Sequence, residues 1–359
     1  MPTTFRILLL IIAFISAILP APAAIAQTAP VEVIKNQLQV SFPDELTFQV
    51  SAQAASSITS IKLIYGSGAR SCQNGQASLE PDFISGTKIE AEWTWELKRS
   101  GALPIGAQVW WQWQFTLADG SSYTTPRQEV TIEDDRHAWN TLNQDGVTVY
   151  WYEGRSSFGR LILDIALDSL SRLELDMGVV SSADISIIIY PTAEEVREAL
   201  IVTSEWAGGV ALPEFNATIV GIAPDELDWA AEVIPHELAH LVTSTRIFNC
   251  KGGRLNTWLN EGLAVYAEGP LSELARESVL ASLDQDSLPV LSSLANGFSA
   301  YGDEARLSYD QSAVMIEYLL MTYGPEQMDA FLSYIQSGQP VNTALVNAFG
   351  LDTAGLDAA

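Results

Sequence analysis

The chain has 359 residues, of which 48% are hydrophobic, and a formal net charge of −26 at pH 7. A surface this acidic repels phosphate backbones and anionic lipids, so we expect no nucleic-acid partner and no association with a membrane surface. The same acidity would help an exported protein to stay soluble.

Residues 1–26 have the pattern of a secretory signal peptide. Arg6 precedes an apolar run over residues 7–19, and residues 24–26 form the A-x-A sequence of a signal-peptidase site. The alternative is an uncleaved membrane anchor, but the run is short for a membrane span and is followed by Pro20 and Pro22. We therefore predict a secreted or periplasmic protein that does not insert into the membrane after signal cleavage.

Residues 27–135 alternate between apolar and polar side chains, as half-buried β-strands do. The clearest runs are residues 89–97 and 109–117, and the second ends at Asp119-Gly120, a hairpin signal. Further strands are expected over residues 46–50, 58–65 and 129–132. Short strands at these intervals predict a small all-β sandwich of immunoglobulin-like type. Its tryptophans could form a carbohydrate platform, but a period of two is more typical of core residues.

Residues 136–337 change to a mixed pattern, and a helical tail is expected over residues 338–359. The expected strands lie over residues 147–151 and 185–190, a hairpin over 208–212 and 217–222, and helices over 158–175, 311–321 and 326–335. Strands followed by helices predict an α+β domain after the β-sandwich.

Two histidines, His236 and His240, stand four residues apart with Glu237 between them, in an H-E-x-x-H motif. On a helix these histidines lie on one face, where both can bind one Zn²⁺, while the glutamate can reach a water at the metal. The alternative is a helix with two surface histidines, but the flanking residues are apolar. Pro235 predicts that the helix either begins near Ile234 or is kinked there.

Glu261 is the expected third zinc ligand. It follows a predicted loop over residues 248–253 and lies in an apolar helical stretch with Trp258 and Leu259. The alternatives are that Glu261 is a surface carboxylate and that Cys250 is the ligand. The second alternative fits the ligand pattern less well.

The H-E-L-A-H and W-L-N-E-G-L-A segments together resemble the gluzincins, the thermolysin-like clan of zinc metallopeptidases. The W-L-N-E-G segment is similar to that of membrane-alanyl aminopeptidases, and residues 147–337 resemble the bacterial peptidase MA-like domain. The resemblance implies a gluzincin fold, with His236, His240 and Glu261 as zinc ligands and Glu237 as general base. It also implies a tyrosine that stabilises the tetrahedral intermediate, at the position of Tyr309, with Tyr301 or Tyr323 as alternatives.

The chain departs from the families that it resembles in two further respects. Where thermolysin has an aspartate, four residues after the third ligand, this chain has Val265, and Glu268 is the candidate partner of a histidine. The G-x-M-E-N motif that binds a free amine in the aminopeptidases is missing, and Glu214 is the candidate replacement.

The hairpin before the metal helix is the expected binding site for an extended peptide. An edge strand aligns a peptide by main-chain hydrogen bonds, and the substrate-binding candidates are Gly209, Val210, Ala211 and Glu214. We predict a zinc-dependent endopeptidase for peptide or protein substrates. The alternatives are an aminopeptidase and an inactive envelope or adhesion protein of the same fold.

The chain contains two cysteines, Cys72 and Cys250. In an oxidising compartment they can form one disulfide, and the alternative is two buried thiols. The sequence does not indicate an oligomeric state.

Overall fold

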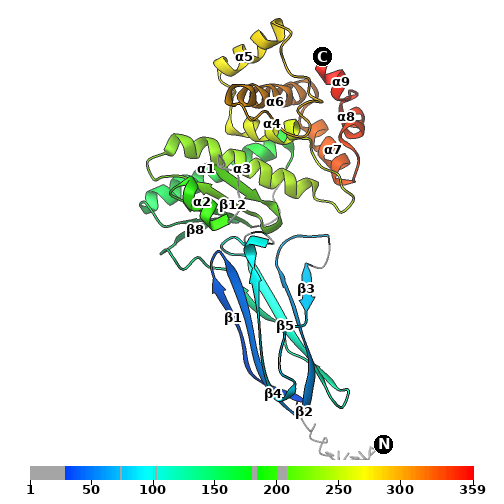
Figure 1. The fold of residues 1–359 in the computed structure, drawn as a ribbon. Helices are drawn as coiled ribbons and strands as arrows, with labels where there is room; N and C mark the ends of the chain where they lie inside the picture. The colour runs from blue at the N-terminus through cyan, green and yellow to red at the C-terminus, as the bar shows by residue number, and fades with distance from the viewer. Residues whose placement is uncertain (1–28, 73–74, 100, 102, 180–183, 201–207) are drawn as a thin grey trace, which may run out of the picture.

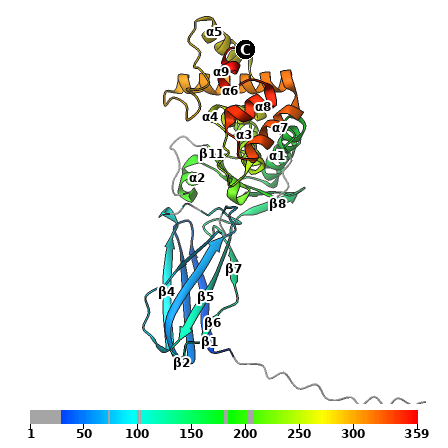
Figure 2. The same cartoon turned by 90° about the vertical axis from the view of Figure 1, so that its right-hand side faces the viewer.

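The computed structural model describes residues 29–72, 75–99, 101, 103–179, 184–200 and 208–359. The predicted signal peptide lies outside the described residues. An elongated β-unit forms the lower part of the molecule, and a mixed unit that carries all the labelled α-helices lies above it (Figures 1 and 2). The predicted α+β class is confirmed.

The β-unit is one antiparallel sheet of seven described strands, in the order β1-β2-β5-β6, with β3 and β4 paired to β2 and β7 paired to β5. The elements are β1 (Val31–Ser41), β2 (Glu45–Ser67), β3 (Gln76–Leu79), β4 (Gly86–Glu96), the short 3-10 helix η1 (Leu97–Arg99), β5 (Gln108–Leu117), β6 (Ser122–Thr124) and β7 (Gln128–Thr131).

The long strand β2 differs from the prediction, which divided it into two strands. Its first half pairs with β1 and β4, and its second half pairs with β3 and β5. The pairing with β4 shifts in register between Gln53 and Ile58, where a turn was expected. One continuous strand therefore links the two halves of the unit, and the immunoglobulin-like assignment stays a prediction.

The tryptophans of the β-unit favour the core interpretation. Trp113 is fully buried and Trp111 is 5% exposed, while Trp93 and Trp95 pack against the same core at its edge. Phe48 and Tyr65 contact the ring of Trp93, with centroids 6.0 and 4.9 Å away. These rings fill the interior in place of an exposed platform.

The mixed unit contains a five-stranded sheet in the order β11-β12-β10-β9-β8, followed by a helical part. Its elements are β8 (Asn140–Gln144), β9 (Val147–Trp151), α1 (Ser156–Met177), β10 (Ile185–Tyr190), α2 (Ala193–Leu200), β11 (Gly209–Leu212), the 3-10 helix η2 (Pro213–Phe215), β12 (Ala217–Gly221), α3 (Leu227–Ile247), α4 (Thr257–Glu268), α5 (Glu273–Asp284), α6 (Gly302–Tyr323), α7 (Pro325–Gln336), α8 (Val341–Phe349) and α9 (Thr353–Asp357).

The sheet separates two apolar layers. β9, β10 and β12 are parallel, whereas β8 and β11 run antiparallel at the two edges. Ile187 and Ile189 of β10 face the core formed with α1 and α3, and Ile188 and Tyr190 face α2. Ile105 of the β-unit packs on that second face.

The C-terminal helices are part of the main core. Leu345 and Phe349 of α8 and Leu356 of α9 are buried in the same apolar cluster as α1, α3 and α7. The segment expected as a tail therefore packs with the preceding domain. No helix of the described residues is both long and apolar enough to cross a membrane.

Candidate metal centre and pocket

The helix α3 positions the two histidines. It begins at Leu227 and continues through Pro235, so its start lies two turns earlier than the proline alone suggests. His236 and His240 lie on the same face, with their Nε2 atoms 3.1 Å apart. The H-E-x-x-H spacing thus directs two imidazole nitrogens to one point.

Glu261 reaches the histidines from the neighbouring helix α4. Its Oε2 atom lies 3.7 Å from His236 Nε2 and 3.5 Å from His240 Nε2. The next residue, Gly262, allows α4 to pack closely on α6, because a Cβ atom there would lie 2.6 Å from the carbonyl oxygen of Ser312. The backbone packing of α4 therefore helps to fix the position of Glu261.

These three side chains fit a tetrahedral metal ion. Zinc–ligand bonds of about 2.0–2.1 Å place neighbouring ligand atoms about 3.3 Å apart, close to the three separations in this cluster. Within the described residues, His236, His240 and Glu261 form a group whose ligand atoms all lie within 4.8 Å of one another.

Glu268 lies on α4, one turn after Val265, and interacts with one of the three ligand residues. Its Oε1 lies 2.7 Å from His236 Nδ1. When Nδ1–H donates to this carboxylate, the lone pair of Nε2 faces the other two ligand atoms, as a metal ligand requires. Glu268 thus occupies the position proposed for a histidine partner.

The charges of the cluster favour a bound cation. Burial alone would lower the pKa of His236, but hydrogen bonds to Glu261 and Glu268 and the charge of Glu237 raise it to about 10. Burial opposes ionisation of Glu261, yet the two histidines lower its pKa to about 2. The carboxylates therefore stabilise positive charge at the point where the three ligand atoms meet.

Glu237 has a different environment from Glu261. It is 7% exposed, and burial raises the pKa of its carboxyl group. Its carboxylate accepts a hydrogen bond from the backbone N–H of Ala211 in β11. A Cβ atom at Gly209 would lie 2.8 Å from Glu237 Cγ, so glycine permits this close approach of strand and helix.

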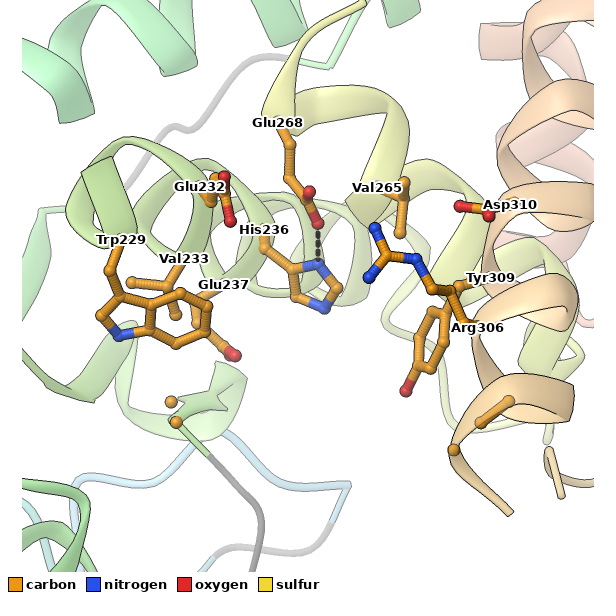
Figure 3. Close-up of a pocket in the computed structure, with 14 residues that line it drawn as sticks. Trp229, Glu232, Val233, His236, Glu237, Val265, Glu268, Arg306, Tyr309 and Asp310 are labelled. Carbon is orange, nitrogen blue, oxygen red and sulfur yellow. Dashed lines mark hydrogen bonds and ion pairs between the residues drawn. The ribbon is translucent and has the colours of Figure 1, made fainter. Parts of the chain in front are cut away.

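A pocket of about 670 Å³ opens beside the cluster (Figure 3). Its lining comes from α3, α4, α6 and the start of β11: Gly208, Gly209, Trp229, Glu232, Val233, His236, Glu237, Val265, Glu268, Gly302, Ala305, Arg306, Tyr309 and Asp310. Figure 3 shows Tyr309 on the α6 side, across the pocket from Glu237. The candidate base and the candidate hydroxyl donor therefore face one space.

Only some of the predicted substrate-binding residues lie at this pocket. Gly209 lines it, and Val210 and Ala211 continue β11, which pairs with β12 on one side and with no other described strand. Glu214 is exposed in η2 and is not among the lining residues, so the prediction that it replaces the amine-binding acid is not supported. Glu214 lies in the turn between β11 and β12, where its backbone carbonyl oxygen accepts a hydrogen bond from Arg70 N–H of the β-unit.

Several lining residues were not predicted from the sequence, among them Trp229, Glu232, Arg306 and Asp310. Helical spacing could have indicated two of them. Glu232 lies four residues before His236, and Arg306 lies three residues before Tyr309, which places each pair on one helix face.

Tyr309 is the best placed of the three candidate tyrosines. Burial and the negative charges of Glu261 and Glu237 raise the pKa of its hydroxyl, so it is a protonated donor at neutral pH. Its ring packs at 87° to Phe298, with the centroids 4.8 Å apart. Tyr301, by contrast, is 75% exposed, and neither it nor Tyr323 lines the pocket.

We predict that Tyr309→Phe lowers kcat by about 10²–10³-fold and leaves the metal bound, because one donor to the developing oxyanion is lost while the ring contact remains. Steady-state kinetics together with metal analysis measures this, and Tyr301→Phe is the matched control. A near-normal kcat for Tyr309→Phe would assign the tyrosine to packing alone.

Comparison with known proteins assigns the class. The family profile of the peptidase MA superfamily matches residues 165–359, which include the whole cluster. The chain belongs to the peptidase MA superfamily. No curated protein matches it.

Several solved structures are distant matches. The bromine derivative of BhCBM56 is 15% identical, with 27% of this chain and 89% of that chain covered and a TM-score of 0.20. Wild-type OgpA from Akkermansia muciniphila is 10% identical, with 33% and 34% covered and a TM-score of 0.23. Spo0M from Bacillus subtilis is 12% identical, with 40% and 55% covered and a TM-score of 0.18. The chain thus spans about a third of OgpA, and scores this low carry no argument about fold or function.

Proposed function

We propose that the protein is an exported zinc metallopeptidase that hydrolyses peptide bonds. One observation carries the proposal. The ligand atoms of His236, His240 and Glu261 meet at one point, beside a buried Glu237 and at the wall of a pocket. Membership of the peptidase MA superfamily supports a peptidase-like function.

The side chains have distinct proposed roles. His236, His240 and Glu261 would hold the zinc ion, and Glu268 would orient His236. A zinc ion bound there would lower the pKa of a coordinated water to about 7 and polarise the substrate carbonyl. Glu237, with its raised pKa, would accept the proton of the attacking water and pass it to the leaving amine.

We further propose internal cleavage of unfolded or extended polypeptides, with an apolar preference near the scissile bond. β11 is an edge strand among the described residues and begins at the pocket, so an extended peptide could pair with it. Trp229 is 39% exposed in the pocket and, with Val233 and Val265, offers apolar contact.

An aminopeptidase is the second candidate, because Glu232 and Asp310 line the pocket and could bind an ammonium group. The position of these acids gives this alternative a firmer basis than Glu214 did. The third candidate is an inactive envelope or adhesion protein, in which the β-unit would be the functional domain.

Metal analysis combined with a cleavage assay tests the proposal. The purified protein should contain one zinc ion per chain and cleave a denatured protein substrate. A chelator should abolish cleavage, and added zinc should restore it. Stoichiometric zinc without cleavage of any peptide would favour the inactive alternative, and absence of zinc would refute the metal assignment.

A pair of peptides that differ only in N-terminal acetylation distinguishes the two peptidase types. We expect internal cuts at similar rates in both peptides, because main-chain pairing along β11 does not need a free amine. Mass spectrometry of the products gives the cut sites. Removal of single residues from the free peptide alone would show an aminopeptidase.

A further inference from the structure

We propose that Arg70 of the β-unit is a positioning residue for the pocket, because it fixes the turn between β11 and β12. Its catalytic consequence rests on the proposed function, whereas the contacts that support it do not. The β-unit would then be a part of the peptidase site and not only an attached module.

Arg70 holds the hairpin turn by two hydrogen bonds. Its backbone N–H donates to the carbonyl oxygen of Glu214 over 2.7 Å, and its Nη2 donates to Asn216 Oδ1 over 2.7 Å. Asn216 has φ 50°, in the left-handed region that asparagine tolerates better than most residues, and it ends η2. The guanidinium is therefore bonded to the residue that sets the direction of the chain into β12.

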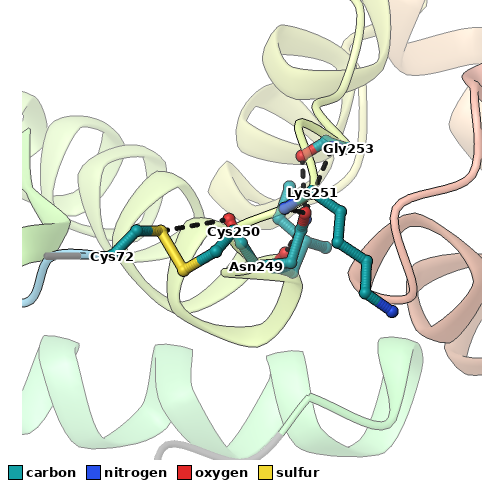
Figure 4. The surroundings of a disulfide bond; sticks show 6 residues. Cys72, Asn249, Cys250, Lys251 and Gly253 are labelled. Atoms are coloured by element: carbon teal, nitrogen blue, oxygen red, sulfur yellow. Dashed lines mark hydrogen bonds between the residues drawn. A yellow bond between two sulfur atoms is a disulfide. The ribbon is translucent and has the colours of Figure 1, made fainter.

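The same segment of the β-unit is fixed at the end of the metal helix. Cys72 and Cys250 form a disulfide across 178 positions of sequence (Figure 4). The Arg70 guanidinium lies 5.6 Å from the ring centroid of Phe248, the residue after α3. Residues 70–72 therefore connect the hairpin turn with the C-terminal end of the helix that carries both histidines.

The loop that receives this disulfide is itself well ordered by hydrogen bonds. Asn249 Nδ2 donates to the carbonyl oxygens of Ile247, Gly253 and Ile335, and Asn249 Oδ1 accepts from Lys251 N–H and Gly253 N–H (Figure 4). A segment anchored on such a loop has a defined position relative to α3.

The hairpin connects the turn at Asn216 with the pocket. From the turn, β11 leads back to Gly209, and on the way the N–H of Ala211 donates to Glu237. A displacement of the turn would therefore shift the strand that is expected to pair with the peptide, together with a hydrogen bond of the candidate base. Arg70 is neither one of the three grouped ligand residues nor a lining residue of the pocket, so we infer that it acts through the hairpin.

Hydrogen–deuterium exchange tests the positioning directly on the full mature protein. In Arg70→Ala, the amides of residues 210–212 and 214–216 should exchange about tenfold faster, because a charge-assisted hydrogen bond is lost. Exchange in α3 and α6 should not change. Asn216→Gly keeps the left-handed turn and removes the acceptor, so it should have the same effect, and the double variant should add little. Arg127→Ala is the control, because the residues that Arg127 contacts, Glu129 and Trp110, lie within the β-unit.

Kinetics with two substrates separates positioning from general stability. For an extended peptide of about ten residues, Arg70→Ala should raise KM about tenfold. For a blocked dipeptide with a chromogenic leaving group, which is too short to pair along β11, KM should stay near the wild-type value. Zinc content should be unchanged in both variants.

Two results would overturn the proposal. One is unchanged exchange over residues 210–212 and 214–216 in both variants, and the other is an equal loss of activity toward both substrates. If the wild-type protein cleaves neither substrate, the proposed function fails, and the exchange data still decide whether Arg70 positions the hairpin.

Discussion

Glu237→Gln should retain zinc and lose peptide hydrolysis, with kcat lowered by about 10²–10⁴-fold, the usual contribution of a general base. The amide has the size of the carboxylate but cannot accept the proton of the attacking water. None of the three ligand side chains is altered, so metal affinity should stay close to that of the wild type. Steady-state kinetics on a denatured protein substrate, with zinc analysis of the same sample, measures both quantities.

Glu277→Gln is a matched control, because it makes the same chemical change on the exposed face of α5, away from the pocket. Its activity should equal that of the wild type. Retained hydrolysis in Glu237→Gln would mean that the proton is accepted elsewhere, and the proposed mechanism would then be wrong.

His240→Ala and Glu261→Ala should lose the metal, because each removes one of three protein ligands. Zinc added to the wild-type protein after removal of its metal with a chelator should raise Tm, since a ligand that binds only the folded state stabilises it, and this shift should disappear in both variants. Thermal unfolding with and without zinc measures metal binding independently of enzymatic activity.

Glu268→Gln allows the loss of a ligand to be compared with the loss of a residue that only orients a ligand. Glu268 bonds His236 Nδ1 and is not among the three grouped ligands, so its variant should weaken zinc binding by about 10–100-fold, less than removal of a ligand. Full zinc occupancy in Glu261→Ala would show that the third ligand is another residue.

The sequence predicted the site better than its surroundings. The spacing of His236, Glu237 and His240 is local and specifies one helix face, and a family motif indicated Glu261. Glu268 became the candidate partner of a histidine because Val265 occupies the position of the family's aspartate and Glu268 lies two turns beyond Glu261. The structure brings these five residues together on α3 and α4, with Glu237 buried beside the group that His236, His240 and Glu261 form.

Other features depend on contacts that no local pattern specifies. The predicted break in β2 rested on two separate alternating runs, but residues 54–57 contain neither glycine nor proline to end the strand. Glu214 was assigned to the pocket from its closeness in sequence, whereas it lies in η2, where its backbone carbonyl oxygen accepts a hydrogen bond from Arg70 N–H. The contacts of Arg70 with Asn216, and of Cys72 with Cys250, join residues 146 and 178 positions apart.

The location of the metal tests the central claim most directly. A crystal of the zinc-treated protein, measured on both sides of the zinc absorption edge, should show one anomalous peak about 2.0–2.2 Å from His236 Nε2, His240 Nε2 and Glu261 Oε2. A peak at any other group of side chains, with none between these three atoms, would contradict the assignment of the metal centre.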